Sequence, residues 1–356
     1  MKELKLMKGN EALAEAAIRA GCDAYFGYPI TPQSEVLEYL AREAEKRTGM
    51  VVLQAESEVA SINMVYGGAG TGKKVMTSSS SPGVSLMQEA ISYIACAELP
   101  CLMVNVQRGG PGLGTIQPSQ ADYFQTVKGG GHGDYRLITL APATVQEMAD
   151  MVKEGFELAF KYRNPVMILT DGALGQMMEK VELFPQQPRD VEFRHEWETT
   201  GKPKGEERNF ITSLSLEADK MEEINIHLQK KYKEIEENEV QIEEYMTEDA
   251  DYIITAYGLV ARVCKKAAQL GREKGLKIGV VRPITLFPFP KKEISALAER
   301  TKGFLTVEMS AGQMVEDVSL TINGRIPSEF YGRMGGNVPS PEEILEALEQ
   351  KLVGGA

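Results

Sequence analysis

The stretch Cys101-Leu-Met-Val-Asn-Val-Gln-Arg-Gly-Gly-Pro-Gly-Leu-Gly-Thr115 decides the fold of this chain. Its first six residues, Cys101 to Val106, are mostly apolar, which predicts a buried strand, and the glycines that follow predict a loop. A short strand that is buried on both faces is typical of a parallel sheet with helices on either side. Arg108 lies where the strand enters the loop, so its cation can reach an anionic ligand; a flexible surface loop is the alternative.

Segments of the same kind lie on both sides of this strand. Short apolar strands are predicted at 23–27, 50–54, 74–77, 137–140 and 165–170. Helices are predicted at 11–20, with Asn10 as its N-cap, and at 32–46, 57–70, 83–95 and 145–160. Strands that alternate with helices of this length indicate an α/β fold whose parallel sheet is covered on both faces.

The pattern changes after about residue 185. Residues 217–249 are rich in charge, which predicts a solvated helical connector, with a partner-binding arm as the alternative. A second α/β pattern follows, with strands at 251–256, 277–281 and 303–308 and helices at 259–271, 313–323 and 341–352. The expected division is a first α/β domain at 1–185, a charged helical connector at 186–247 and a second α/β domain at 248–356.

Composition narrows the class of protein. The 356 residues, of which 43% are hydrophobic and 25% charged, are ordinary for soluble globular domains. The net charge of -12 argues against a general nucleic-acid binder. The N-terminus has no apolar core of signal-peptide length, and no stretch approaches the ~18–20 apolar residues of a membrane span. We therefore expect a cytoplasmic protein.

The four cysteines are Cys22, Cys96, Cys101 and Cys264, and their spacing matches neither a CxxC pair nor an iron–sulfur run. We expect buried, reduced thiols and no metal site in this chain. Any iron–sulfur cluster that the chemistry needs would have to lie on another chain.

A glycine-rich stretch, Gly67-Gly-Ala-Gly-Thr-Gly-Lys-Lys74, satisfies the first part of a phosphate-loop motif. Lys74 stands where that loop needs Ser or Thr, and a helical pattern precedes the glycines where a strand is required. We expect these glycines to end a helix and not to bind a nucleotide.

The loop Gly27-Tyr-Pro-Ile-Thr-Pro32 follows a predicted strand, and the carboxyl ends of strands form the ligand crevice of an open α/β sheet. Two prolines stiffen the loop, and Thr31 offers a hydroxyl. On these residues alone, a helix entry with Thr31 as N-cap and Pro32 at the first helical position is the simpler interpretation.

Two carboxylates follow the next predicted strand. Glu56 and Glu58 flank Ser57, which suits an N-cap, and carboxylates in a first helical turn suit the helix dipole. The residues after Glu58 are mostly small or apolar, so its carboxyl borders a buried face and would be desolvated.

Together these segments resemble the alpha subunit of the 2-oxoacid:ferredoxin oxidoreductases. The matching pieces are Gly27–Glu35, Glu56–Ser61, Thr77–Met87, Gln107–Gly114, Gln120–Asp122, Gly131–Asp134 and Glu308–Gln313. They span nearly the whole chain in one order, which is more specific than any single motif. Gly109–Pro118 and Tyr331–Gly336 most resemble the branched-chain (2-oxoisovalerate) members, whereas 2-oxoglutarate members tend to have Pro-Ser-Thr-Gly in place of Pro111-Gly-Leu-Gly114.

The resemblance implies a thiamine-diphosphate-binding domain of the pyrimidine type and a transketolase C-terminal-like domain. It implies oxidative decarboxylation of a 2-oxoacid, with 3-methyl-2-oxobutanoate as the expected substrate, coenzyme A as co-substrate and ferredoxin as electron acceptor. The chain has no Gly-Asp-Gly segment, so a beta subunit is expected to hold the diphosphate and Mg²⁺ of a shared cofactor. Iron–sulfur clusters are expected in further subunits.

The resemblance also assigns roles to residues. Glu58 matches the carboxyl that hydrogen-bonds the pyrimidine N1′, with Glu56 as its rival. Thr31 matches a substrate-contacting threonine. Arg108 matches an arginine associated with the substrate carboxylate or coenzyme A, and its planar guanidinium can bind a carboxylate through two hydrogen bonds.

The remaining matches concern the walls of the site. Tyr28, Pro29 and Ile30 are expected to contact the cofactor, together with Ser81, Pro82 and Gly83. His132 and Asp134 either line the site or stabilise a loop.

Three other interpretations stay open. The chain could be the alpha subunit of a 2-oxoglutarate:ferredoxin oxidoreductase, part of a lipoamide-linked or non-redox thiamine enzyme, or a non-catalytic interaction subunit. The electron acceptor separates the enzymes, and tolerance of Glu58→Gln would indicate a scaffold.

Overall fold

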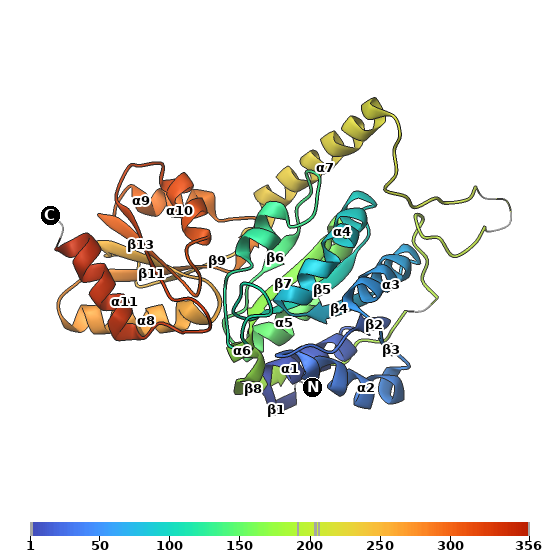
Figure 1. Cartoon of the computed structure of the whole chain (residues 1–356), viewed down its shortest axis with the longest axis horizontal. Helices are drawn as coiled ribbons and strands as arrows, with labels where there is room; N and C mark the ends of the chain where they lie inside the picture. The colour runs from blue at the N-terminus through green and yellow to red at the C-terminus, as the bar shows by residue number, and fades with distance from the viewer. Residues whose placement is uncertain (1–2, 191, 203–204, 206, 355–356) are drawn as a thin grey trace.

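Two helix-covered sheets lie side by side in the computed structural model (Figure 1). The structure describes residues 3–190, 192–202, 205 and 207–354. The seven-stranded sheet has the order β12-β6-β7-β5-β4-β2-β3, and the five-stranded sheet has the order β14-β13-β10-β11-β9. We call the parts built on these sheets the first unit and the second unit.

The first sheet contains all six strands that the sequence predicts for it. They are β2 (Ala24–Gly27), β3 (Val51–Gln54), β4 (Val75–Ser79), β5 (Cys101–Gln107), β6 (Ile138–Leu140) and β7 (Pro165–Asp171). All six are parallel. The seventh strand, β12 (Thr285–Phe287), comes from the C-terminal part of the chain and pairs antiparallel with β6. It was not predicted, because three residues carry too little periodicity.

Helices cover both faces of the first sheet, as its apolar strands require. On one face, α1 (Gly9–Arg19), α2 (Ser34–Thr48) and α5 (Val145–Tyr162) share a core with the sheet. On the other face, α3 (Glu58–Gly70) and α4 (Ser81–Cys96) form a second core. The short helix α6 (Gly172–Gln176) follows β7. The predicted α/β class with a covered parallel sheet is confirmed.

Two helix starts differ from the prediction. α1 begins earlier, so Asn10 is not a cap, and its Nδ2 donates to Pro32 O at 2.7 Å. α2 begins at Ser34, so Thr31 is not its N-cap. The carbonyl oxygen of Thr31 accepts from Arg108 at 2.8 Å. The carbonyl groups of this turn are therefore bonded by side chains from distant parts of the chain, whereas an N-cap would use hydrogen bonds within its own helix.

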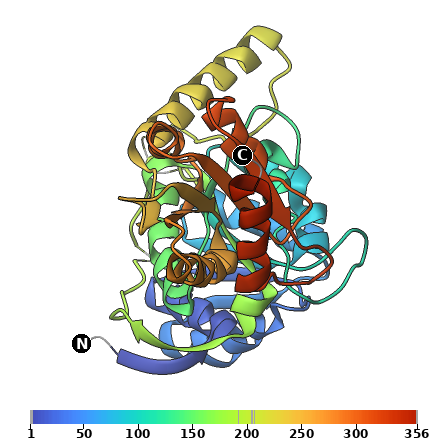
Figure 2. The ribbon, with the colours of Figure 1, turned by 90° about the vertical axis from the view of Figure 1, so that its left-hand side faces the viewer.

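The second unit contains the predicted strands β10 (Tyr252–Thr255), β11 (Ile278–Pro283) and β13 (Gly303–Glu308) and the predicted helices α8 (Gly258–Glu273), α10 (Met314–Ile322) and α11 (Pro341–Leu348). A π-helical turn, Glu349–Val353, continues α11. Three elements were not predicted: β9 (Ile242–Tyr245), β14 (Ser328–Gly332) and α9 (Lys291–Ala298). β9 is antiparallel to β11, and the other strands are parallel. Figure 2 shows this unit in front of the first.

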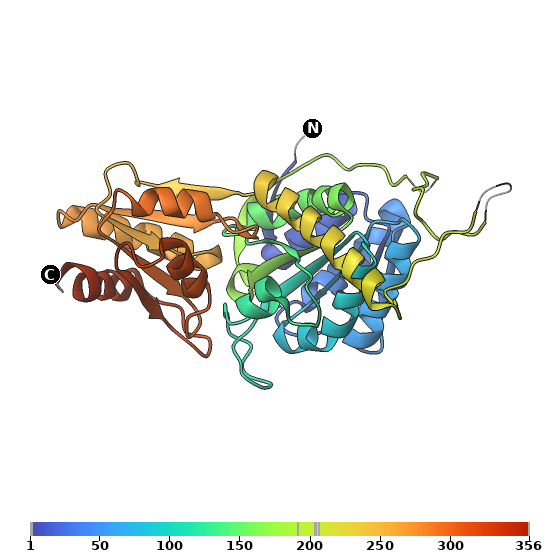
Figure 3. The same ribbon diagram turned by 90° about the horizontal axis from the view of Figure 1, so that it is seen from above.

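The charged segment forms one long helix, α7 (Ala218–Asn238), which lies across the first unit (Figure 3). Leu228, Tyr232 and Ile235 are buried, and most of the other side chains are exposed. A helix in this segment was predicted. The domain limits at 185 and 247 stay a prediction, and both β9 and β12 join sheets across such limits.

A two-stranded ribbon, which was not predicted, links the chain start to the end of the first unit. In it β1 (Glu3–Lys8) pairs antiparallel with β8 (Met178–Leu183). All four cysteines have free thiols. Cys22, Cys101 and Cys264 are buried, Cys96 is half-buried, and burial raises the pKa of the Cys101 thiol to about 12. No described helix is long and apolar enough to cross a membrane.

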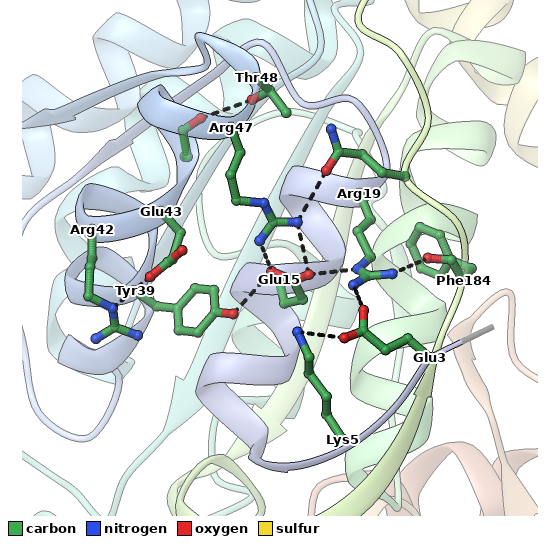
Figure 4. Close-up of polar contacts among 12 residues, drawn as sticks. Glu3, Lys5, Glu15, Arg19, Tyr39, Arg42, Glu43, Arg47, Thr48 and Phe184 are labelled. Carbon is green, nitrogen blue, oxygen red and sulfur yellow. Dashed lines mark hydrogen bonds and ion pairs between the residues drawn. The ribbon is translucent and has the colours of Figure 1, made fainter. Parts of the chain in front are cut away.

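A buried carboxylate fixes the packing of α1 against α2 (Figure 4). Glu15, which has no exposed surface, accepts hydrogen bonds from Arg19 Nε at 2.6 Å, Arg47 Nη1 at 2.5 Å and Tyr39 Oη at 3.0 Å. Arg19 also donates to Phe184 O at 2.9 Å, beyond β8. Burial alone would raise the pKa of Glu15, but the hydrogen bonds and ion pairs with the two arginines lower it below 4.5.

We expect Glu15→Gln to lower the free energy of unfolding by about 3–5 kcal/mol at neutral pH, because Arg47 loses its counter-charge and Arg19 keeps only its pair with the exposed Glu3. Since the folded-state pKa of Glu15 is lowered, its contribution is complete above pH 4.5 and is lost as the pH falls through the lowered value. Urea unfolding at neutral and acid pH measures both effects. The control is Glu43→Gln, which breaks a more exposed pair with Arg42 and should cost at most ~1 kcal/mol. Equal losses in the two variants would contradict the assignment.

Candidate functional site

The Arg108 guanidinium joins two of the predicted loops. Arg108 follows β5 and is 8% exposed. Its Nη1 donates to Thr31 O at 2.8 Å, and its Nη2 donates to Leu113 O at 3.0 Å. Within the described part of the chain no carboxylate pairs with this guanidinium, and its Nε has no hydrogen-bond partner. A buried cation without a counter-charge is unfavourable, so the arrangement favours an anionic ligand.

The loop after β2 is fixed beside this cation. Gln33 N donates to Ile30 O at 3.0 Å, and Gln33 Nε2 donates to Tyr28 O at 3.3 Å. Ser78, on β4, donates to Gln33 Oε1 at 2.6 Å. The segment from Tyr28 through Pro29 to Ile30 is therefore tied to the sheet, while the Thr31 side chain is exposed. Thr31 and Arg108, which the sequence singled out separately, are in contact through the Thr31 carbonyl and not through its hydroxyl.

A serine at the start of α4 connects Arg108 to an acidic side chain. Ser81 Oγ accepts from Arg108 N at 3.0 Å and donates to Asp122 Oδ2 at 2.5 Å. Asn105 Nδ2 donates to the same Asp122 oxygen at 2.9 Å. Burial raises the pKa of Asp122, although these two hydrogen bonds act to lower it. No role was predicted for Asp122, because it lies in a loop without periodicity and only the family motif includes it.

Glu58 is the buried member of the carboxylate pair. It is 6% exposed at the first position of α3, whereas Glu56 is exposed. Ser57 is the N-cap, as predicted, and its side chain accepts from Ala60 N at 3.2 Å. Among the described residues, no hydrogen-bond partner reaches the Glu58 carboxylate. Burial thus separates the two candidates that the sequence left open, in favour of Glu58.

The first turn of α4 passes close to Glu58. A Cβ at Gly83 would lie 2.6 Å from Glu58 Oε1 and 2.1 Å from Ser79 Oγ. Only glycine allows this approach. The Oγ atoms of Ser79 and Ser80 are also buried, and neither has a hydrogen-bond partner in the described residues. The Glu58 carboxylate and these two hydroxyls lie beside the start of α4, where they can form hydrogen bonds with a polar ligand.

A cavity of about 840 Å³ opens beside Arg108, between the two units. The first unit contributes Ser81, Pro82 and Asp122, and the second unit contributes Met309 and Met334. The cavity lining includes neither Glu58 nor Thr31. The predicted site residues thus lie around two places, the Arg108 cavity and the Glu58 turn, and the start of α4 contributes to both.

Hydrogen bonds fix the second unit at this cavity. Gln120 N donates to Met309 O at 2.9 Å, and Met309 N donates to Gln120 Oε1 at 3.0 Å. Tyr123 Oη donates to Asp317 Oδ2 at 2.6 Å. The Glu308 carboxylate accepts from the backbone N–H groups that start α10, and burial raises its pKa against the effect of these bonds. The family motif at 308–313 therefore forms part of the cavity wall, and these hydrogen bonds hold it in place.

Two other sequence candidates lie elsewhere. His132 and Asp134 are not at the Arg108 cavity; they line a second cavity of about 120 Å³, together with Tyr93 and with Leu228 of α7. The glycines of 67–72 end α3, as predicted. A Cβ at Gly72 would lie 2.5 Å from a Glu198 carboxylate oxygen, so this glycine lets the segment before α7 pack on the helix end.

Comparison with known families covers both units. Residues 15–247 match the family described as pyruvate flavodoxin/ferredoxin oxidoreductase, thiamine-diphosphate-binding. Residues 250–344 match pyruvate:ferredoxin oxidoreductase core domain II.

Two individual proteins that are similar to this chain are also subunits of 2-oxoacid oxidoreductases or synthases. The chain is 52% identical over 348 residues to the ketoisovalerate oxidoreductase subunit VorB of Methanothermobacter marburgensis, and the match covers 97% of each chain. It is 34% identical over 380 residues to the 2-oxoglutarate synthase subunit KorA of that organism, covering 98% of this chain and 99% of the relative.

Two solved structures are also similar. One is the 2-oxoglutarate:ferredoxin oxidoreductase from Magnetococcus marinus with 2-oxoglutarate, coenzyme A and succinyl-CoA bound. It has a TM-score of 0.85 and 30% identity, and the match covers 98% of this chain and 65% of that chain. A split-gene transketolase, 14% identical over 98% of each chain with a TM-score of 0.61, shares the fold.

We expect Gly83→Ala to lower the free energy of unfolding by roughly 1–3 kcal/mol, because the added methyl group overlaps Glu58 and Ser79. The control is Gly67→Ala, in α3, where the new methyl group meets no atom within 4 Å. That change should be neutral or stabilising by about 0.5–1 kcal/mol, as for Gly→Ala in other helices. Urea unfolding of the purified chain measures both. A Gly83 variant as stable as the Gly67 variant would contradict the close packing.

Proposed function

Because the chain belongs to the 2-oxoacid:ferredoxin oxidoreductase family, we propose that it is the subunit that binds 3-methyl-2-oxobutanoate for oxidative decarboxylation to an acyl-CoA. Family membership confirms the resemblance predicted from the sequence. The branched-chain substrate is supported by the relative that is 52% identical, which is named for ketoisovalerate. The observation that carries the proposal is the unpaired cation of Arg108 on one side of the α4 start and the buried carboxyl of Glu58 on the other.

The residues around Glu58 fit the aminopyrimidine ring of thiamine diphosphate. The ring needs a carboxyl for its N1′ nitrogen and a surface without side chains for its flat face. Glu58 is buried without a partner among the described residues, and it faces Gly83. We assign the ring's other contacts to Tyr28, Pro29, Ile30, Ser81 and Pro82. When bound, thiamine diphosphate supplies a nucleophilic carbon and an electron sink for the decarboxylation of a 2-oxoacid.

In this mechanism Glu58 holds the proton that it shares with N1′, and the water-poor environment of its carboxyl makes that hydrogen bond stronger than it would be in water. Arg108 binds the carboxylate of the 2-oxoacid through its unpaired edge, and Thr31, whose carbonyl it already contacts, orients the keto group. Ser81 keeps the Arg108 backbone in place.

A partner chain fits the edge of the molecule next to Glu58. Large apolar side chains are exposed there on β3, α3 and α4: Val51, Leu53, Val59, Met64 and Leu86. Apolar surface of this kind marks protein interfaces. We propose that a beta subunit covers it and holds the diphosphate and Mg²⁺, and that further subunits carry the iron–sulfur clusters that reduce ferredoxin in the cytoplasm. Relatives that are named as subunits support a multi-subunit enzyme.

Glu58→Gln tests the proposal most directly. Glutamine keeps the size of the side chain but cannot share a proton with N1′ as a carboxyl does. Turnover of the assembled complex should fall by ~10²–10⁴-fold, and hydrogen–deuterium exchange at thiamine C2 should slow with it. The matched control is Glu56→Gln, at the exposed carboxylate, which should be mild. If only the Glu56 variant slows exchange, the assignment is two residues off; if neither does, this chain is a scaffold.

Arg108→Ala should raise the Michaelis constant for the 2-oxoacid. Loss of a hydrogen bond to a charged group costs about 1.5–3 kcal/mol, which corresponds to a tenfold to more than hundredfold change. Steady-state kinetics with viologen as electron acceptor, with the 2-oxoacid and coenzyme A varied in turn, measure the effect. A change confined to coenzyme A would move Arg108 to the co-substrate, and unchanged constants for both would remove it from the site.

A further inference from the structure

Charges are scarce in the wall of the Arg108 cavity. Of the described residues that line it, only Arg108 and Asp122 carry charged side chains. A 2-oxoacid with a second carboxylate would therefore bury one anion with no cation to bind it, close to the Asp122 carboxyl. Burying an unpaired charge is strongly unfavourable. The wall favours a 2-oxoacid whose only charge is the carboxylate that Arg108 binds.

The other side chains of the wall are uncharged: some are polar, Ser81, Ser85, Ser119, Ser310 and Gln313, and the apolar ones come from both units. Pro82 and Pro111 belong to the first unit, and Met309 and Met334 belong to the second. Met309 is 1% exposed and packed into the core, whereas Met334 is 60% exposed. Unlike Met309, Met334 can therefore change its side-chain conformation to pack against a ligand. A flexible thioether side chain adapts well to such contacts.

The backbone that carries Met334 is fixed relative to Arg108. Its carbonyl accepts from Asn337 Nδ2 at 3.0 Å, and Arg333 N donates to Glu308 O at 3.1 Å. The next two residues pack on the loop that Arg108 holds. A Cβ at Gly109 would lie 3.0 Å from Gly335 C, and a Cβ at Gly336 would lie 2.3 Å from Gln117 Cβ. The distance between the cation and the Met334 backbone is therefore set by direct contact between two loops.

We propose that Met334 determines which 2-oxoacid side chain the enzyme accepts, a role that rests on the proposed function. Arg108 holds the carboxylate, and Met334 packs against the branched apolar end of the same molecule. The second unit then selects the substrate, while the first unit holds the groups that react. Because the contact between the two loops is fixed, the distance between Arg108 and the Met334 backbone is fixed too. A 2-oxoacid with a shorter side chain would therefore leave a gap between its end and Met334.

The experiment uses the assembled complex and compares kcat/KM for 3-methyl-2-oxobutanoate, pyruvate and 2-oxoglutarate. Met334→Ala should lower the preference for 3-methyl-2-oxobutanoate over pyruvate by about tenfold or more, since a single missing methylene in an apolar pocket has an effect of that size. Met334→Lys should raise 2-oxoglutarate relative to 3-methyl-2-oxobutanoate by about tenfold or more, because it adds the missing cation. The control is Val338→Ala, on the same loop but outside the lining, which should keep the wild-type ratios.

The outcomes separate the two proposals. A wild-type complex that decarboxylates no 2-oxoacid overturns the proposed function. An active wild-type complex whose Met334 variants keep the substrate ratios within about twofold overturns the role of Met334 and leaves the proposed function standing. Variants that change only the Michaelis constant for coenzyme A also overturn it, since Met334 would then face the co-substrate.

Discussion

The arrangement of the site depends on a guanidinium that is held by neutral groups. Two backbone carbonyls, of Thr31 and Leu113, fix Arg108 in a buried position without neutralising it. A carboxylate in their place would bind the guanidinium more strongly and would also neutralise the charge that the proposed role of Arg108 requires. The glycine-rich loop is shaped by the same contact. A Cβ at Gly114 would lie 1.9 Å from Gly109 O, so only glycine lets the loop fold back to place the Leu113 carbonyl.

The second unit completes the cavity through a seam of hydrogen bonds. The reciprocal pair between Gln120 and Met309 joins a first-unit loop to the end of β13, and the Glu308 carboxylate stiffens that end by capping α10. Buried hydrogen bonds whose donors and acceptors satisfy one another leave the two units little freedom to slide. One wall of the cavity therefore belongs to the second unit and yet is positioned as firmly as the strand ends of the first.

Local sequence signals predicted the parts of the structure that local interactions determine. Strands such as β5, β7 and β13 were recognised because their apolar runs are buried on both faces. Ser57 was recognised as a cap because capping involves only four neighbouring residues. The interpretation of Thr31 as an N-cap was wrong because its carbonyl accepts a hydrogen bond from Arg108, which is 77 residues away in the sequence. A related reason explains why three further features were not predicted: β12, Asp122 and Met334. Each gains its role from a partner in another loop or sheet, and no periodicity marks such a residue.

The two ionisable groups of the site would neutralise each other if they met. A buried carboxylate and a buried guanidinium that both lack a counter-charge attract strongly in a medium of low dielectric constant. The start of α4 keeps them apart: Ser81 contacts the Arg108 backbone, and Gly83 contacts Glu58. Ser81 also donates a hydrogen bond to Asp122. Among the described residues neither group therefore has a counter-charge, which suits the roles proposed for them, Arg108 at a substrate carboxylate and Glu58 at a cofactor ring. The energetic cost of keeping them unpaired is a reason to expect that the assembled enzyme, with ligand and partner chain in place, is more stable than this chain alone.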